Sequence, residues 1–170
     1  MARLHDAQVA SLYKYFFLII EPVSALTGAY YSFYQPQVYL DLTHANSSPK
    51  NGIPISIQIV LAQLANLYFL FAINEALVLR STTDLKVWRA VLFCLLIADF
   101  GHLYSVKAVG WDVYWNMFGW NAIDWGNVFF VYVGASMRLS FLLGFGVAPP
   151  GQQAVRRSSR GKRPSTRLKN

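Results

Sequence analysis

An arginine inside an apolar segment constrains this chain more than any other feature. Residues 122–147 are long enough for a helix to cross a bilayer, yet Arg138 lies within that length. An arginine charge is costly in hydrocarbon, so Arg138 must face protein or water and find a partner there. The opposite helix face, with Phe129, Val133 and Leu139, is apolar and can face lipid. We therefore expect several helices packed around a polar interior.

The composition and the patterning of the apolar stretches indicate a membrane protein. Hydrophobic residues make up 55% of the chain and charged residues only 14%, whereas soluble domains carry about 25% charged residues. A soluble helix bundle would need a polar face along each helix, and none of the four apolar stretches has one. The predicted fold is all-α, a four-helix transmembrane bundle with spans at about residues 12–34, 55–79, 87–106 and 122–147.

The predicted domain organisation is a short N-terminus at residues 1–11, a membrane domain at 12–147 and a tail at 148–170. The net charge of +7 arises entirely in the tail, because the rest of the chain balances its bases and acids. The tail composition predicts disorder. A basic tail beside a membrane favours anionic lipid as its partner over nucleic acid.

The distribution of positive charge predicts the orientation in the membrane. Of the 15 Lys and Arg residues, 12 lie in the N-terminal part, the second loop and the tail, and only two lie in the other loops. The positive-inside rule then places both termini in the cytoplasm. The sequon Asn46-Ser47-Ser48 would lie on the lumenal side as a possible glycosylation site. These signals favour the endoplasmic reticulum or another membrane of the secretory pathway.

The polar residues inside the spans fall at two depths in the membrane, which we call layers. The first layer contains a basic residue, Arg138. Counting along each span places Glu21, Asn74, Glu75 and Arg138 toward the cytoplasmic side. We expect Arg138 to form an ion pair with Glu75 or Glu21, which either locks the helices together or serves a function. Gly134, one turn before Arg138, is interpreted as a point of close helix packing.

The second layer, from mid-membrane toward the lumen, contains Asp99, His102, Asn127 and Trp125, with no obvious cation. Asp99 and His102 are three residues apart, so they can share a helix face and form a hydrogen bond. Such a bond would fix the imidazole tautomer, as in a proton-transfer pair, but it is also how a buried histidine is simply satisfied. No metal site or cofactor is predicted, because the other two histidines lie outside the spans.

Local signals predict where helices bend and begin. Pro22 has no backbone N–H, so we expect a kink in the first span and a carbonyl free for another partner. Asp84 or Thr83 is expected to cap the third span, and Asn121 or Asp124 the fourth.

Four runs of the sequence resemble a family of small filamentous-fungal four-pass membrane proteins: FFLIIEPVSALTGAYY, QLANLYFLFAINEALVLRST, LLIADFGHLYS and DWGNVFFVYVGASMRLSFL. The resemblance implies the four-span fold and no particular activity. A more distant resemblance is to the sterol isomerase (EXPERA-type) superfamily, whose members use intramembrane acids, a histidine and an Asn/Trp pair to move protons on an apolar substrate. The matching residue types here are Glu75, Asp99, His102, Trp125 and Asn127.

These observations leave three functional hypotheses. The first is a protein that binds a lipid, sterol or terpenoid-like ligand, or acts as a small membrane partner subunit. Its expected ligand-binding residues are Asn74, Trp125, Asn127, Glu21 and Arg138. The second is a membrane-embedded isomerase or cyclase acting on a sterol, terpenoid or polyketide-type substrate, with Asp99 and His102 transferring protons and Glu75 as the acid. The third, transport, would require oligomerisation.

Overall fold

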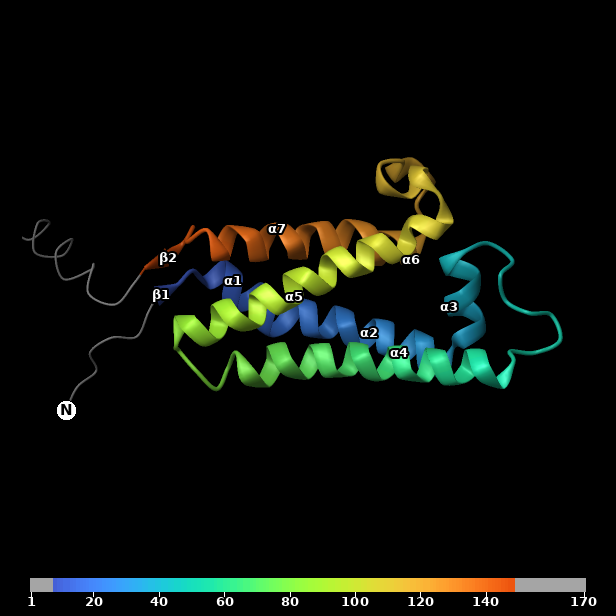
Figure 1. The fold of residues 1–170 in the computed structure, drawn as a ribbon, viewed down its shortest axis with the longest axis horizontal. Helices are drawn as coiled ribbons and strands as arrows, with labels where there is room; N and C mark the ends of the chain where they lie inside the picture. Colours follow the sequence, from blue (N-terminus) through green and yellow to red (C-terminus); the bar gives the residue numbers. More distant parts are fainter. Residues whose placement is uncertain (1–7, 149–170) are drawn as a thin grey trace, which may run out of the picture.

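The computed structural model describes residues 8–148, and helices account for most of them (Figure 1). Three helical units are long and apolar enough to cross a membrane: Ser11–Tyr34, Ile55–Val78 and Leu85–Val109. The prediction of an all-helical membrane protein is confirmed to that extent. The two strands, β1 (Gln8–Val9) and β2 (Val147–Ala148), are two residues each.

Each long unit combines an α-helix with a different helical turn. The first consists of α1 (Ser11–Tyr15), a π-helical turn (Phe16–Ile20) and α2 (Glu21–Tyr34). The second is α4 (Ile55–Ile73) followed by a π-helical turn (Asn74–Val78). The third is α5 (Leu85–Ser105), extended by a 3-10 turn (Val106–Val109).

A fourth helical unit occupies the region of the fourth expected span. It is built from α6 (Ala122–Asp124), a π-helical turn (Trp125–Phe130) and α7 (Val131–Leu142). It is not one of the three units that meet the length and hydropathy criteria for a span. The number of crossings and the orientation therefore remain predictions.

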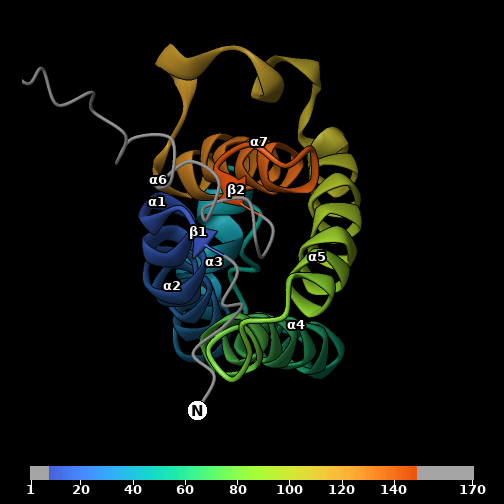
Figure 2. The same cartoon turned by 90° about the vertical axis from the view of Figure 1, so that its left-hand side faces the viewer.

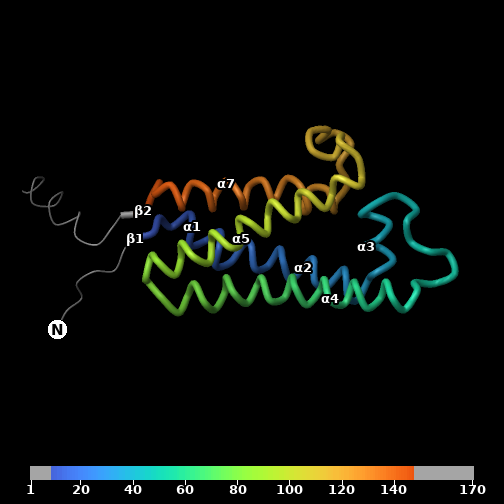
Figure 3. The backbone as a smooth tube through the Cα atoms, in the orientation of Figure 1, coloured from blue at the N-terminus to red at the C-terminus, as the bar shows by residue number. Residues whose placement is uncertain are grey.

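The four units run alongside one another, and the end-on view shows them around a common centre (Figures 2 and 3). α2 packs along α4, and α5 packs along α7. An aromatic core that includes Phe17, Trp88 and Phe141 lies between the first, third and fourth units. Many outward side chains are large and apolar, such as Ile59 and Phe93, as expected for helices that face lipid.

The two ends of the described chain lie together at one end of the bundle (Figure 1). β1 and β2 pair as antiparallel strands. The amide of Ala10 donates to the carbonyl of Gly146 at 3.0 Å, and the hydroxyl of Tyr13 donates to the carbonyl of Phe145 at 2.9 Å. Gly146 has a φ of +68° and lies close to Ala10 and Tyr13, so this position suits glycine.

The expected helix caps are confirmed. Asp84 accepts a hydrogen bond from the amide of Lys86 at the start of α5. Asn121 and Asp124 form a capping box at the start of α6.

An additional helix, α3 (Pro36–Thr43), occupies the first loop and was not predicted from the sequence. Its first residue is proline, whose fixed φ and missing N–H suit the start of a helix. The side-chain amide of Asn121 donates to the carbonyl of Leu42 at 2.7 Å, so α3 is fastened to the fourth unit.

A kink was expected at Pro22, and the π-helical turn Phe16–Ile20 ends just before Glu21-Pro22; a bend of the helix axis remains a prediction. The carbonyl expected to be left without an amide donor has a side-chain partner. In a regular α-helix, the carbonyl of Leu18 would accept from residue 22, but Pro22 has no N–H to donate. Arg80, at the end of the second unit, donates to the carbonyl of Leu18 at 2.6 Å. The proline in the first unit therefore creates an attachment point for the second.

This arrangement predicts that the contributions of Arg80 and Pro22 to stability are coupled. Arg80→Ala should lower the free energy of unfolding in detergent by about 1 kcal/mol, because it removes one charged hydrogen bond. In a Pro22→Ala background the loss should be smaller, because residue 22 then supplies its own amide. A double-mutant cycle measured by thermal unfolding checks this coupling, and equal losses in both backgrounds would contradict it.

Candidate functional site

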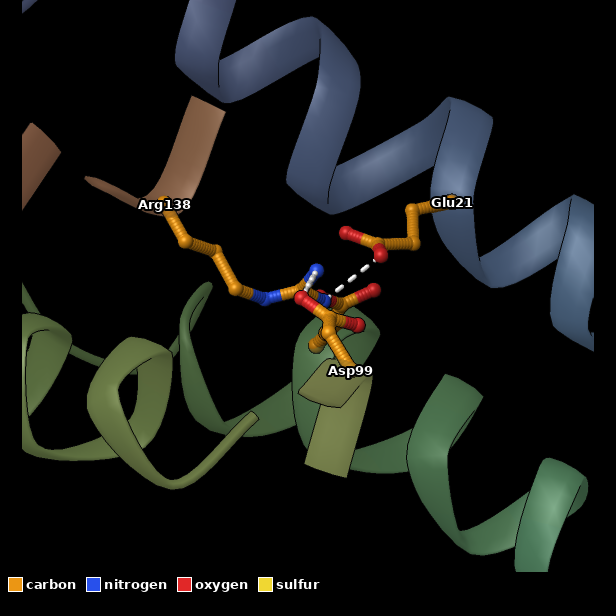
Figure 4. A network of polar contacts seen from close by, with 4 residues as sticks. Glu21, Asp99 and Arg138 are labelled. Atoms are coloured by element: carbon orange, nitrogen blue, oxygen red, sulfur yellow. Dashed lines mark hydrogen bonds and ion pairs between the residues drawn. The ribbon is translucent and has the colours of Figure 1, made fainter. Parts of the chain in front are cut away.

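The candidate site is a network in which three carboxylates surround the guanidinium of Arg138 (Figure 4). Nη2 of Arg138 lies 2.6 Å from Oε1 of Glu21 and 3.0 Å from Oε1 of Glu75. Nη1 lies 2.8 Å from Oδ2 of Asp99. Each of the four side chains comes from a different helical unit, so one arginine connects all four.

Aromatic rings accompany the ion pairs. The guanidinium carbon of Arg138 lies 5.6 Å from the ring centroid of Phe17 and 5.4 Å from that of Phe71. These distances suit cation–π attraction, which is stronger in a site without water. The side chain of Arg138 is 0% exposed, so its charge is buried among the three carboxyl groups and the two rings.

Two of the acids lie next to or inside a π-helical turn. Glu21 follows directly after the π-helical turn Phe16–Ile20, and Glu75 lies inside the turn Asn74–Val78. A π-helical turn has more residues than an α-turn, so it changes the direction in which the following side chains point, and such turns are frequent at functional sites.

Gly134 makes room for the guanidinium. A Cβ atom at this position would lie 2.8 Å from Nη1 of Arg138 and 3.2 Å from Oε1 of Glu21. Both are closer than ordinary van der Waals contact. The glycine interpreted from the sequence as a helix-packing position therefore serves the polar network.

The network contains more acid than base. One guanidinium faces three carboxyl groups, which gives a formal charge of −2 if all three are ionised. Both Glu21 and Glu75 bond to Nη2, so their carboxyl groups also approach each other. Within residues 8–148, three buried atoms of the network have no hydrogen-bond partner: Oε2 of Glu21, Oε2 of Glu75 and Nε of Arg138. The two carboxylate oxygens can accept further hydrogen bonds, whereas Nε of Arg138 can donate one.

The structure confirms one predicted pairing and corrects another. Arg138 pairs with both Glu21 and Glu75, as expected from their depth. The expected hydrogen bond between Asp99 and His102 is wrong, because Asp99 bonds to Arg138 instead. Because α5 packs along α7, Asp99 lies beside the guanidinium of Arg138. A charged guanidinium is a stronger hydrogen-bond partner for a carboxylate than an imidazole is.

Two residues of the expected second layer, His102 and Asn127, lie together. Both are half-buried, and they are within hydrogen-bonding reach of each other. In the described part of the chain, Nε2 of His102 has no partner. This pair is separate from the arginine network, since no hydrogen bond or ion pair joins the two among residues 8–148.

The remaining predicted site residues are not in the network. Asn74 is half-buried beside Glu75. Trp125 is 44% exposed and packs against Trp120 and Phe129, and its part in ligand binding remains a prediction. Asn46 is exposed in the loop after α3, and its glycosylation remains a prediction.

Two further predictions concern metal binding and the basic tail. No cluster of His, Cys, Asp or Glu in residues 8–148 is arranged to hold a metal ion. The basic tail, which was expected to contact anionic lipid, lies outside the described residues apart from Ala148.

The position of Gly134 generates a prediction with a control on the same helical unit. Gly134→Ala should lower the unfolding free energy by about 1–3 kcal/mol, because the guanidinium cannot move away without lengthening its ion pairs. Gly126→Ala should cause no loss, because a Cβ there meets nothing within 4 Å. Thermal unfolding of both variants in detergent checks the difference. Equal stability of the two would show that the network is not tightly packed.

The comparisons with known proteins identify a family but no activity. No curated protein and no solved structure matches the chain. One family matches residues 6–148, a range that includes all four residues of the arginine network. The chain therefore belongs to the family described as a domain of unknown function, DUF7704.

Proposed function

We propose that this protein crosses the membrane four times and binds a lipid-like ligand at the arginine network. Three units have the length and hydropathy of spans. The fourth contains a buried charge that the network compensates, which makes its place in a membrane acceptable. The chain ends lie together at one end of the bundle, as four crossings require. With the positive-inside rule, both termini are cytoplasmic, in a membrane such as the endoplasmic reticulum.

The observation that carries the proposal is the unused acceptor capacity of the network. Oε2 of Glu21 and Oε2 of Glu75 are buried and accept no hydrogen bond from another residue of the described chain. The two carboxyl groups lie against each other, which is costly when both are ionised. A ligand whose polar end donates hydrogen bonds would satisfy both atoms, and a protonated amine would also reduce the excess negative charge. An amine or hydroxyl at the end of an apolar molecule has this chemistry.

The location of the network suggests where such a ligand would lie. Glu21 and Glu75 come from the helix pair that contains α2 and α4, and Asp99 and Arg138 come from the pair that contains α5 and α7. The network therefore joins two helix pairs. The side chains of Glu21 and Asp99 are each 7% exposed, whereas those of Glu75 and Arg138 are 0% exposed. We propose that the ligand approaches between the pairs, past Glu21 or Asp99.

Binding is better supported than acid–base catalysis. The catalytic hypothesis depended on an Asp99–His102 pair, and Asp99 is bonded to Arg138. His102 keeps an unpartnered Nε2, but it lacks the carboxylate that would orient it as a base. The resemblance to sterol isomerases remains an analogy of residue types. If no ligand binds, the alternative is that the protein acts as a small partner subunit of a membrane complex.

Photocrosslinking of the protein in phosphatidylcholine vesicles tests the proposal. A photoactivatable sphingosine, which carries an amine and hydroxyls, should label peptides near residues 16–25 and 70–80 more strongly than a photoactivatable fatty acid of equal chain length. Glu21→Gln and Glu75→Gln should each reduce sphingosine labelling by about tenfold, since each removes a charge-assisted acceptor.

Asp112→Asn is the matched control, because it makes the same chemical change at an exposed position outside the network. Size-exclusion chromatography confirms that each variant is folded. If the two probes label equally, or if both glutamine variants label like wild type, ligand binding at the network is refuted. The four residues would then act as a structural lock in a partner subunit.

A further inference from the structure

The connection between α5 and α6 is a folded lobe with a fixed inner side. Residues 106–120, called here the aromatic lobe, form three short 3-10 turns: Val106–Val109, Trp111–Tyr114 and Met117–Gly119. The hydroxyl of Tyr114 donates to the carbonyl of Leu103 at 2.6 Å. Nε1 of Trp120 donates to the carbonyl of Val113 at 2.8 Å. These bonds give the lobe a defined shape and attach it to α5.

The lobe exposes several large apolar side chains, together with the polar Asp112 and Asn116. Trp111 and Trp115 are each 61% exposed, Met117 is 50% exposed, and Phe118 is fully exposed. Several large apolar side chains exposed within one short segment indicate a contact with protein or membrane, because a large apolar surface is rarely left in water.

The lobe lies beside the bundle. In Figure 1 it projects sideways from the end of the bundle opposite β1 and β2, and the end-on view in Figure 2 shows it beyond the flank of α7. When the helices stand upright in a bilayer, the lobe therefore extends along the membrane plane at the level of the helix ends. That level is the boundary between acyl chains and headgroups.

The chemistry of the lobe suits that boundary. Tryptophan and tyrosine are enriched at membrane interfaces, because their rings are apolar while their N–H or O–H group can reach water. Lys107 lies 5.3 Å from the ring centroid of Trp111 and 5.8 Å from that of Tyr104. A lysine beside aromatic rings can keep its stem in the apolar region and its ammonium among the phosphates.

We propose that the aromatic lobe is an interfacial anchor that inserts Trp111, Trp115 and Phe118 into the leaflet opposite the chain termini. The occupant of its outer surface is the lipid of the membrane that the helices span. This anchor would fix the depth and tilt of α5 and the fourth unit, which supply Asp99 and Arg138. The proposal depends on membrane insertion and is independent of ligand binding at the network.

Spin-label accessibility in phosphatidylcholine vesicles tests the anchor. A nitroxide is attached to Phe118→Cys in a Cys94→Ser background, and its relaxation by oxygen, which concentrates in lipid, is compared with that by a water-soluble nickel chelate. Two other positions of the chain serve as references, one for a label in lipid and one for a label in water. Its native cysteine, Cys94, is exposed on the membrane-spanning α5, and Lys50→Cys labels an exposed residue in the loop between α3 and α4.

The ratio of oxygen to nickel relaxation at Phe118 should be several-fold higher than at Lys50 but lower than at Cys94, which lies near the middle of α5. A label at Met117→Cys should behave in the same way, which guards against a local effect of one substitution. A ratio equal to that at Lys50 would overturn the proposal, because the lobe would then project into water. Low accessibility to both reagents would also overturn it, since the lobe would then be covered by protein, and spin–spin broadening would identify a second copy.

Discussion

The buried charge of Arg138 is the constraint on which the rest of the structure depends. Removing one partner of a buried ion pair typically costs about 3–5 kcal/mol, because the other charge is left uncompensated. Moving any one of the other three helical units away would therefore break an ion pair with Arg138 and destabilise the bundle. Glycine at position 134 leaves space for the guanidinium, Phe17 and Phe71 lie near it, and π-helical turns adjoin or contain two of the three acids.

A polar network has a particular value between helices in lipid. Lipid tails are as apolar as leucine, so apolar contact alone provides little drive for helices to associate. Ion pairs and hydrogen bonds do provide it, and they also select one arrangement of the helices over others. Here the charged contacts join the α2–α4 pair to the α5–α7 pair, while the aromatic core around Phe17, Trp88 and Phe141 supports the bundle nearer the chain termini.

The sequence predicted the features that depend on local chemistry or on depth. Pro22 identified an irregular helix, Asp84 and Asn121 identified helix starts, and residue counting placed Glu21 and Glu75 level with Arg138. Asp99 was assigned to His102 because the two are neighbours on one helix, but its partner is set by the packing of α5 along α7, which no local pattern contains. The role of Gly134 and the folded shape of residues 106–120 depend likewise on contacts between segments.

The number of acids around Arg138 is more informative than the arginine itself. A guanidinium needs one carboxylate to balance its charge, and replacing a buried ion network with well-packed apolar side chains is often neutral or stabilising. The third carboxyl group gives each of the other three helical units a partner for Arg138, but it also adds the cost of desolvating another acid and of repulsion among the three. The unpartnered oxygens of Glu21 and Glu75 are the atoms at which that cost is visible. A positively charged or hydrogen-bond-donating group that binds there would offset it, and this is the argument for the proposed binding role.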